Sequence, residues 1–264
     1  MSETLYLDNT MLQAFNKCPK HFYWRHIRHL VPKGAVPSAL LFGSSIHLAL
    51  EALYKGGTLE EAICLFENDY SQYDGLDSKR TLGKGIQIMK SYVKQYFPEY
   101  FKVLEVESGL TAELSSDIMF VGRADLIVEM KNGIYIMEHK TSSNMTSFND
   151  KPNHQMTGYT WAVRELGYDC KGVIVNILGV YKTKEDFLRK VTTRSDEEIF
   201  QWKLWVMDTK RKIDECLGNK YFPMYTGSCW NCTFVKLCAS SNELMCEAQV
   251  KGLYVEEIWK PWDD

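Results

Sequence analysis

The chain has 264 residues, 45% of them hydrophobic, and its formal net charge at pH 7 is −3. This is ample for one core, and no apolar run approaches the roughly 20 residues that a membrane-spanning helix needs. A negative total is unusual for a protein that binds nucleic acid, because phosphate contacts favour a basic surface. The opening residues lack the basic segment and apolar core of a signal peptide, so we expect a cytoplasmic protein.

Helical periodicity and stop signals predict helices before and after a central group of strands. The expected helices cover residues 9–22, 40–54, 59–70, 81–97, 154–166 and 196–217. Strands are expected between residues 102 and 140 and over residues 172–180. Because helices come before and after the strands in the sequence, we expect an α/β fold in which helices cover both faces of a mixed sheet.

One β-hairpin carries the most informative side chains. Asn132-Gly133 lies between apolar, β-branched runs, which is the strongest short-range signal for a hairpin. With these two residues as the loop, Asp125 faces Lys140. Residues opposite one another, or two apart on one strand, share a face. We therefore expect Asp125, Glu138 and Lys140 on one side, whereas a three-residue loop would place His139 opposite Asp125.

Two carboxylates and an ammonium are the minimum set for metal-dependent phosphodiester cleavage. Carboxylate oxygens are usual protein ligands of Mg²⁺, and the metal lowers the pKa of a bound water and neutralises phosphate charge. Lys140 is suited to orienting that water or stabilising the developing negative charge. The same triplet also fits a surface hairpin with a salt bridge of little energetic value.

Four of the eight cysteines form a pattern, with Cys229-x₂-Cys232-x₅-Cys238 near the C-terminus and Cys18 near the N-terminus. A reducing interior favours metal ligation over disulfides. Four thiolates suit a [4Fe–4S] cluster or structural Zn²⁺, and one distant cysteine plus a close trio fits iron–sulfur somewhat better. Cys246 could replace one member. The remaining cysteines are expected to be buried as small apolar side chains: Cys64, Cys170 and Cys216.

Together these residues resemble the RecB-like nucleases of the PD-(D/E)XK superfamily, within its iron–sulfur branch. That branch includes CRISPR-associated RecB-like exonucleases, the AddB nuclease domain and phage relatives. The resemblance runs from Asp8 to about Cys238, with its elements in the family's order. The matching elements are Cys18-Pro19, Gly43-Ser-Ser-Ile-His47, Gly122-Arg-Ala-Asp125, Glu138-His-Lys140-Thr141, Gln155-Met-Thr-Gly-Tyr159, and Cys229, Cys232 and Cys238.

The resemblance implies a restriction-endonuclease-like core and a metal-dependent DNA exonuclease that acts on single strands or DNA ends. It implies that His47, Asp125 and Glu138 bind Mg²⁺ or Mn²⁺, with the backbone carbonyl of residue 139 as a further ligand. Lys140 would assist the water, and the four matching cysteines would hold a structural [4Fe–4S] cluster. The family often has an apolar or aromatic residue where this chain has His139, whose ring we expect on the opposite face and not as a ligand.

Further candidates lie on helices and on one strand. A lone histidine in an apolar helix is usually a core residue, but Glu51 lies one turn after His47 and could orient its ring. Gln155 and Tyr159 are also four residues apart, so both can face the cleft and position DNA or the lysine. Glu107, on the predicted strand over residues 103–108, is a weaker candidate.

Two segments, residues 17–33 and 182–194, are locally basic although the net charge of the chain is negative. In the first, Phe22, Tyr23 and Trp24 interleave with cations, which suits single strands whose bases stack on rings. The alternative is that at least two of these rings pack around the cysteines.

We expect a single domain over residues 1–264. Its parts would be a helical segment 1–100, a catalytic core 101–195, and a C-terminal helix and cluster segment 196–264. The alternative to an enzyme is a non-catalytic DNA-end-binding or adaptor subunit. An enzyme that works inside a helicase–nuclease or CRISPR adaptation complex is a third possibility, for which residues 256–264 would suit a docking tail or an ordinary solvated terminus.

Overall fold

The computed structural model describes residues 4–34 and 36–260. Residues 2 and 3 of the opening segment and residues 261–264 of the predicted tail lie outside the described residues. The chain divides into two compact units. Unit 1 comprises residues 1–34, 111–122 and 196–264, and unit 2 comprises residues 35–110 and 123–195. No described helix has the length and apolar character to span a bilayer.

The main elements follow one another as helices, strands and helices again. They are β1 (Leu5–Leu7), α1 (Asn9–Lys17), α2 (Pro19–Phe22), β2 (Leu30–Pro32), α3 (Ser38–Tyr54), α4 (Leu59–Tyr70), α5 (Leu82–Tyr96), β3 (Lys102–Ser115), β4 (Ile118–Met130), β5 (Gly133–Ser142), α6 (His154–Glu165), β6 (Cys170–Val180), β7 (Glu185–Thr192), α7 (Asp196–Gly218), α8 (Val235–Cys238), α9 (Glu243–Leu253) and β8 (Tyr254–Glu256). All the predicted helices are confirmed to within two residues at their ends, but the first is divided at Cys18.

The ends of the helices follow from their flanking residues. Cys18 is extended (φ −167°, ψ 112°) because a residue before proline is disfavoured in the helical region, so α1 stops and α2 begins at Pro19. Thr58 and Glu61 form a reciprocal capping box at the start of α4. Asn153 accepts a hydrogen bond from the Met156 amide and so fixes the first turn of α6.

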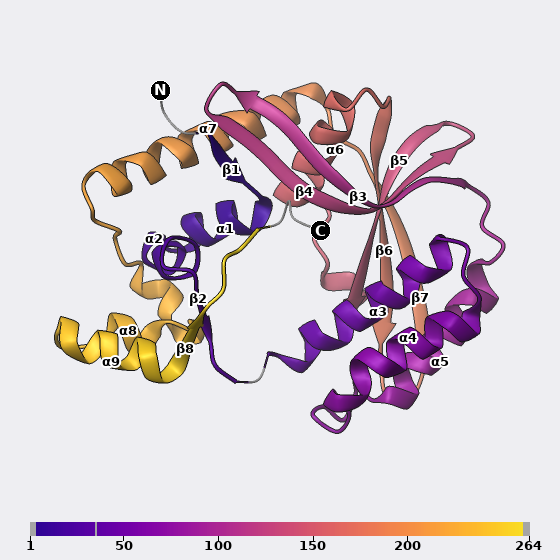
Figure 1. Ribbon diagram of the computed structural model, residues 1–264. Helices are drawn as coiled ribbons and strands as arrows, with labels where there is room; N and C mark the ends of the chain where they lie inside the picture. The colour runs from indigo at the N-terminus through magenta and orange to yellow at the C-terminus, as the bar shows by residue number, and fades with distance from the viewer. Residues whose placement is uncertain (1–3, 35, 261–264) are drawn as a thin grey trace. The chain divides into compact units, whose positions relative to one another are not determined.

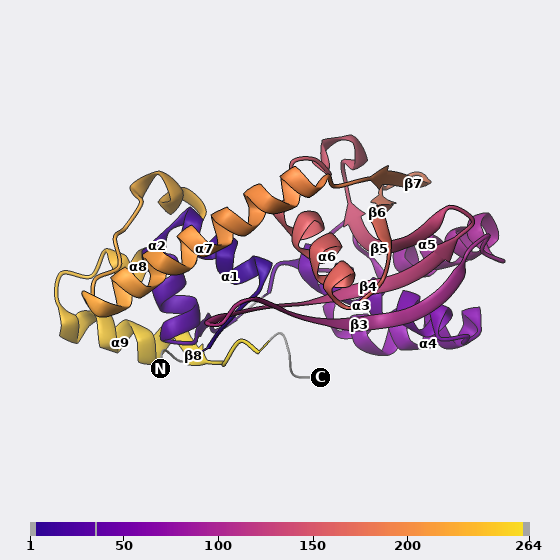
Figure 2. The same cartoon turned by 90° about the horizontal axis from the view of Figure 1, so that it is seen from above.

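The strands form a mixed sheet in the order β1-β4-β5-β6-β7, with β3 also paired to β4. The β4–β5 and β6–β7 pairs are antiparallel and the β5–β6 pair is parallel. Within unit 2, α6 lies on one side of β5 and β6, and α4 and α5 lie on the other (Figure 2). The predicted fold class, a mixed sheet flanked by helices, is therefore confirmed.

The predicted register of the β4–β5 hairpin is wrong by two residues. Its loop is residues 131–132, and Gly133 already belongs to β5, at φ +135°, a conformation that glycine adopts at little cost. The observed pair Leu126–Met137 sets Asp125 opposite the glutamate of the Glu-x-Lys motif rather than its lysine. Because side chains alternate with a period of two, this shift keeps all three site residues on the predicted common face.

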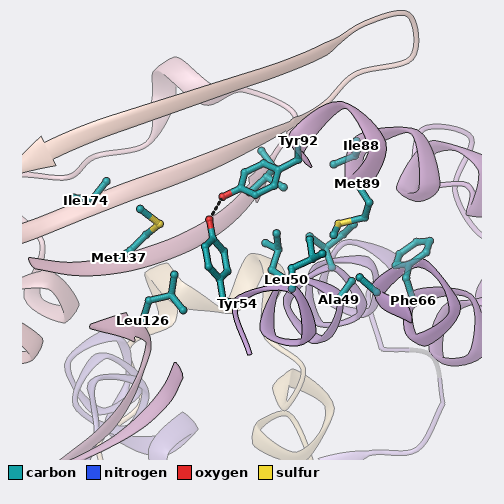
Figure 3. Packing of buried hydrophobic residues seen from close by; sticks show 14 of the residues in the cluster. Ala49, Leu50, Tyr54, Phe66, Ile88, Met89, Tyr92, Leu126, Met137 and Ile174 are labelled. Atoms are coloured by element: carbon teal, nitrogen blue, oxygen red, sulfur yellow. Dashed lines mark hydrogen bonds between the residues drawn. The ribbon is translucent and has the colours of Figure 1, made fainter. Parts of the chain in front are cut away.

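The core of unit 2 lies between the sheet and the helices α3, α4 and α5. Leu50 and Phe66 on the helices are fully buried, as are the facing strand residues Leu126 and Met137. Figure 3 shows Leu126, Met137 and Ile174 on the strand side of this core and Leu50, Met89 and Phe66 on the helix side. This packing fixes α3 on β4 and β5.

Unit 1 brings together segments from both ends of the chain. β2 and β8 pair as antiparallel strands and lie side by side (Figure 1). Beside them, Trp24, Phe234 and Tyr254 form part of a buried apolar cluster. The indole Nε1 of Trp259 donates to Asp8 at 2.6 Å. In the predicted tail, Trp259 is therefore held by a contact within unit 1, whereas residues 256–258 and 260 are exposed.

The two basic segments are largely occupied by internal partners, contrary to their predicted availability for phosphate. In unit 1, Arg25 pairs with Glu257 at 3.4 Å. In unit 2, the second segment contains strand β7, which the sequence analysis missed. Its Arg189 pairs with Glu99, and the buried Arg194 donates to Thr157.

Candidate active site

His47 and Asp125 meet where α3 crosses the sheet in unit 2. The imidazole Nδ1 of His47 lies 3.2 Å from Oδ1 of Asp125. The other oxygen of Asp125 accepts a hydrogen bond from the backbone N–H of His139 at 2.6 Å. The carboxylate of Asp125 is thus held from a helix on one side and from strand β5 on the other.

Glu138 and Lys140 project toward α6, which supplies two further side chains. The Lys140 ammonium donates to Oε1 of Glu138 at 2.7 Å, and Gln155 Nε2 donates to the same oxygen at 3.0 Å. Gln155 also accepts from Lys140 at 3.4 Å and donates to the Tyr159 hydroxyl at 3.3 Å. The structure therefore brings together the two carboxylates, the lysine and the predicted positioning pair.

Glu107 enters the site from β3 and completes a compact group of ligand atoms. One ligand atom each from His47, Glu107 and Asp125 lie within 4.8 Å of one another. Among the described residues this is the one such group, and Glu138 stands outside it. The sequence gives little warning of this role, because Glu107 belongs to no motif. Its φ of +50°, unusual within a strand, is visible only in three dimensions.

The donor set fits a hard divalent cation. Oε2 of Glu138 is buried without a hydrogen-bond partner in the described structure. A buried carboxylate oxygen left unpaired is costly, and a metal ion is one partner that would satisfy it. Carboxylate oxygens with an imidazole are ligands that Mg²⁺ and Mn²⁺ accept.

Burial and mutual repulsion set the charges of these acids. Desolvation and the neighbouring Asp125 raise the pKa of Glu138 to about 7. The same two causes raise the pKa of Glu107 to about 7. Burial would also raise the pKa of Asp125, but His47 outweighs it and lowers that pKa to about 2. For His47, burial opposes protonation, yet Asp125 raises its pKa.

Lys140 keeps its charge despite its depth. Burial works against the ammonium, but Glu138 outweighs burial and raises the pKa of Lys140. Beside Lys140 a cavity of about 610 Å³ opens along α3, with His47 and Glu107 in its lining. Gly43 allows α3 to approach this closely, because a Cβ there would lie 3.2 Å from Oγ1 of Thr141.

Two expectations about neighbouring residues have different outcomes. Glu51 accepts a hydrogen bond from Lys55 at 2.6 Å, so the structure pairs it with that lysine instead of with the His47 ring. The His139 ring lies on the face opposite Glu138, as expected. It stacks on Tyr54 with ring centroids 5.6 Å apart, and its Nδ1 lies 2.7 Å from Nδ2 of Asn176.

The four patterned cysteines meet in unit 1. One cavity is lined by Cys18, Cys229, Cys232 and Cys238. The Tyr225 amide donates to the sulfur of Cys18, and the Trp24 indole donates to that of Cys238, each at 3.4 Å. His21 Nδ1 lies 3.6 Å from the sulfur of Cys232. Among residues 4–34 and 36–260, no three of these sulfurs lie within 4.8 Å of one another.

The predicted burial of the other cysteines and of the aromatic residues 22–24 agrees with the structure in part. Cys246 packs against the same apolar cluster but does not line the cavity. Cys170 is buried as expected, but Cys216 is only half-buried. Cys64 is exposed, so that prediction is wrong, because its side chain lies on the outer face of α4. Trp24 is buried in the apolar cluster and bonded to Cys238, and Tyr23 packs against the same cluster as Cys232 and Cys238, which supports the packing alternative for these two rings.

The profile of the PD-(D/E)XK nuclease superfamily matches residues 9–239. The chain belongs to this superfamily. A crystal structure from Eubacterium rectale, described as that of a candidate exonuclease, is similar with a TM-score of 0.56 and 14% identity. The match covers 91% of each chain. SSO0001 matches at a TM-score of 0.34 and 15% identity, over 89% of this chain and 96% of the other. A search of curated proteins found no match.

Membership of the PD-(D/E)XK superfamily supports a nuclease with a possible divalent-metal site at the group described above. The likeness to the Eubacterium rectale protein adds that a similar fold extends over 91% of the chain.

Proposed function

We propose that this protein is a metal-dependent deoxyribonuclease, an exonuclease that acts on single-stranded DNA or DNA ends. The observation that carries the proposal is the convergence of His47, Glu107, Asp125 and Glu138 beside the charged Lys140. Superfamily membership and the described activity of the Eubacterium rectale protein support the same reading.

His47, Asp125 and Glu138 would hold Mg²⁺ or Mn²⁺, with the backbone carbonyl of residue 139, and we add Glu107 to this set. When bound, such a cation lowers the pKa of a coordinated water and neutralises charge on the phosphate. Asp125 is ready for this role because its low pKa keeps it ionised across the neutral range.

The side chains of the chain itself supply orientation and charge. The Lys140 ammonium, held by Glu138 and Gln155, is placed to donate a hydrogen bond to the attacking water or to a non-bridging phosphate oxygen. Gln155 restrains that lysine directly, and Tyr159 acts on it through Gln155. The Tyr159 hydroxyl would offer a donor to the DNA backbone. These two residues also support assignment to the RecB-like subgroup.

For the second site, we propose a structural [4Fe–4S] cluster held by Cys18, Cys229, Cys232 and Cys238. Structural Zn²⁺, with Zn–S bonds near 2.3 Å, would draw tetrahedral sulfurs to about 3.8 Å from one another. Structural Zn²⁺ remains the alternative group, since four thiolates suit either. Hydrogen bonds from Trp24 and Tyr225 to two of the sulfurs also suit thiolate ligands. The cluster would cross-link the segments of unit 1. We propose that the protein is cytoplasmic.

The decisive experiment uses purified protein and single-stranded oligonucleotides labelled at the 5′ or the 3′ end. We expect stepwise shortening with Mn²⁺ or Mg²⁺, none with a chelator, and none for Asp125→Ala with metal. The label that survives gives the polarity. DNA binding by the wild-type protein without cleavage in any metal would instead establish the adaptor alternative, whether or not the protein works inside a larger complex.

A further inference from the structure

Three neighbouring strands of unit 2 carry a buried polar residue in one row. His139 on β5 is in register with Asn176 on β6, and Asn176 is in register with Arg189 on β7. Register places the three side chains on one face of the sheet. His139 and Asn176 are at most 2% exposed, and the Arg189 side chain is 9% exposed. A continuous polar row in this position is unusual, because the surrounding core is apolar.

The row is joined by hydrogen bonds and ends on an ion pair. Asn176 Nδ2 lies 2.7 Å from Nδ1 of His139, and Arg189 Nε donates to Oδ1 of Asn176 at 3.2 Å. The Arg189 guanidinium then donates to both oxygens of Glu99, at 2.5 and 2.9 Å. The carboxylate of Glu99 thus compensates the charge that Arg189 brings into the core.

Two tyrosines close the network from the helices. The hydroxyls of Tyr54 and Tyr92 lie 2.6 Å apart, as the dashed line in Figure 3 marks. Asn176 Nδ2 also donates to Tyr92 at 2.9 Å, so both amide protons and the amide oxygen are engaged. This fixes the amide in one orientation, in which it presents a donor to Nδ1 of His139. The Tyr54 ring stacks on the His139 ring and holds its plane.

His139 stands between the two motif residues Glu138 and Lys140, and its backbone N–H holds Oδ2 of Asp125. We propose that His139, Asn176 and Arg189 are positioning residues that fix the cation-binding strand through this network. The inference rests on the proposed function and deepens it. A displaced His139 backbone would move the Asp125 contact, the residue 139 carbonyl and the two flanking side chains together.

A role in packing alone is a poor account of these contacts. Replacing a buried ion pair by well-packed apolar residues is often neutral or stabilising, so a core has no energetic need for one. Outer partners of metal ligands commonly change metal affinity or activity by roughly 10–100-fold when removed.

The experiment measures Mn²⁺ affinity at equilibrium without DNA, by calorimetry or by the resonance signal of free Mn²⁺, together with the melting temperature. His139→Phe keeps the stacked ring but removes the acceptor, and we expect its Mn²⁺ affinity to fall about 10–100-fold. His139→Asn returns an acceptor close to the Nδ1 position and should recover most of that loss. If His139→Phe does not fold, Tyr92→Phe, which deletes one hydroxyl of the network, replaces it with an expected loss of about tenfold.

The matched control is the other buried cation between α5 and β7, Lys84, which pairs with Glu185 at 2.6 Å. Arg189→Met should weaken Mn²⁺ binding, whereas Lys84→Met should lower the melting temperature and leave Mn²⁺ affinity unchanged. Equal Mn²⁺ affinity in wild type and in folded His139→Phe or Tyr92→Phe would overturn the inference. So would an equal loss in Arg189→Met and Lys84→Met. A wild-type protein that binds no Mn²⁺ and cuts no DNA would refute the proposed function itself.

Discussion

At the scale of single residues, two glutamic acids make the stability of the metal-free protein depend on pH. The folded state holds protons on Glu107 and Glu138, whose pKa values are raised to about 7, more tightly than the unfolded chain does. Their stabilisation is complete below the ordinary glutamate pKa near 4.5 and is lost as the pH rises through 7. His139 acts in the opposite direction: its pKa is lowered to about 3, so its stabilisation is gained as the pH rises from about 3 through the ordinary histidine pKa near 6.5. The lowered pKa of Asp125 acts below about pH 4.

We therefore predict that these two glutamates lower the melting temperature of the metal-free protein by about 2–4 °C between pH 6.5 and pH 8, measured as the difference between the wild type and the double variant Glu107→Gln/Glu138→Gln. Mn²⁺ should raise the melting temperature more at pH 8, because it competes with protons for the same oxygens. Glu107→Gln should flatten this pH dependence, and the exposed Glu129→Gln on β4 should not. The same pH dependence in the wild type and in Glu107→Gln would contradict the assigned charges.

Lys140 provides a second prediction at this scale. Lys140→Ala should lower kcat by roughly 10²–10⁴-fold, the usual contribution of a positioned proton donor or acceptor. Because the lysine is not a cation ligand, Mn²⁺ affinity should change little. Lys171→Ala is the control, since Lys171 is a half-exposed lysine in the same unit, paired with Asp169. Near-wild-type kcat in Lys140→Ala would remove the residue from the chemistry.

At the scale of elements, α5 packs on α4 through a glycine. A Cβ at Gly85 would lie 2.0 Å from Cζ of the buried Phe66 ring, whereas a Cβ at Gly83, on the same helix, meets nothing within 4 Å. Gly85→Ala should therefore lower the free energy of unfolding by about 1–3 kcal/mol. Gly83→Ala should raise it, by at most about 1 kcal/mol. Denaturant titration of both variants tests this pair, and equal effects would contradict the packing.

The same scale shows which features could be predicted from local sequence. Helices such as 59–70 were predictable because Thr58 and Glu61 form a local cap. The hairpin face was predictable as well, but its register was not, because Asn-Gly locates a turn without fixing which residue begins the next strand. Strand β7 could not be predicted because its charged residues do not resemble a buried strand. The partner that compensates Arg189, Glu99, is 90 residues away in the sequence. Glu107 joins the site only through tertiary folding.

At the scale of the whole molecule, the proposed metal cluster at the four cysteines would tie distant segments of unit 1 together. Cys232→Ala should give colourless and poorly soluble protein, whereas Cys64→Ala, which changes an exposed thiol outside the cavity, should keep the visible absorption of the wild type. Iron analysis and the visible spectrum of freshly purified protein measure this. A brown and soluble Cys232→Ala would reassign the ligands, with Cys246 as the first candidate.

The division of the chain into three consecutive parts stays a prediction; these parts are residues 1–100, 101–195 and 196–264. The two compact units instead alternate along the chain. Strands β3 and β4 each begin in one unit and end in the other without a break, so no linker in the sequence marks the boundary between the units.

The pairing of β2 with β8 has a consequence for biosynthesis. All of unit 2 lies within residues 35–195, so once these residues have left the ribosome, unit 2 can fold. Strand β2 must wait for its partner β8, which is translated more than two hundred residues later. During that interval the buried side chains of the opening helices are uncovered, which makes the nascent amino-terminal segment a natural client for chaperones.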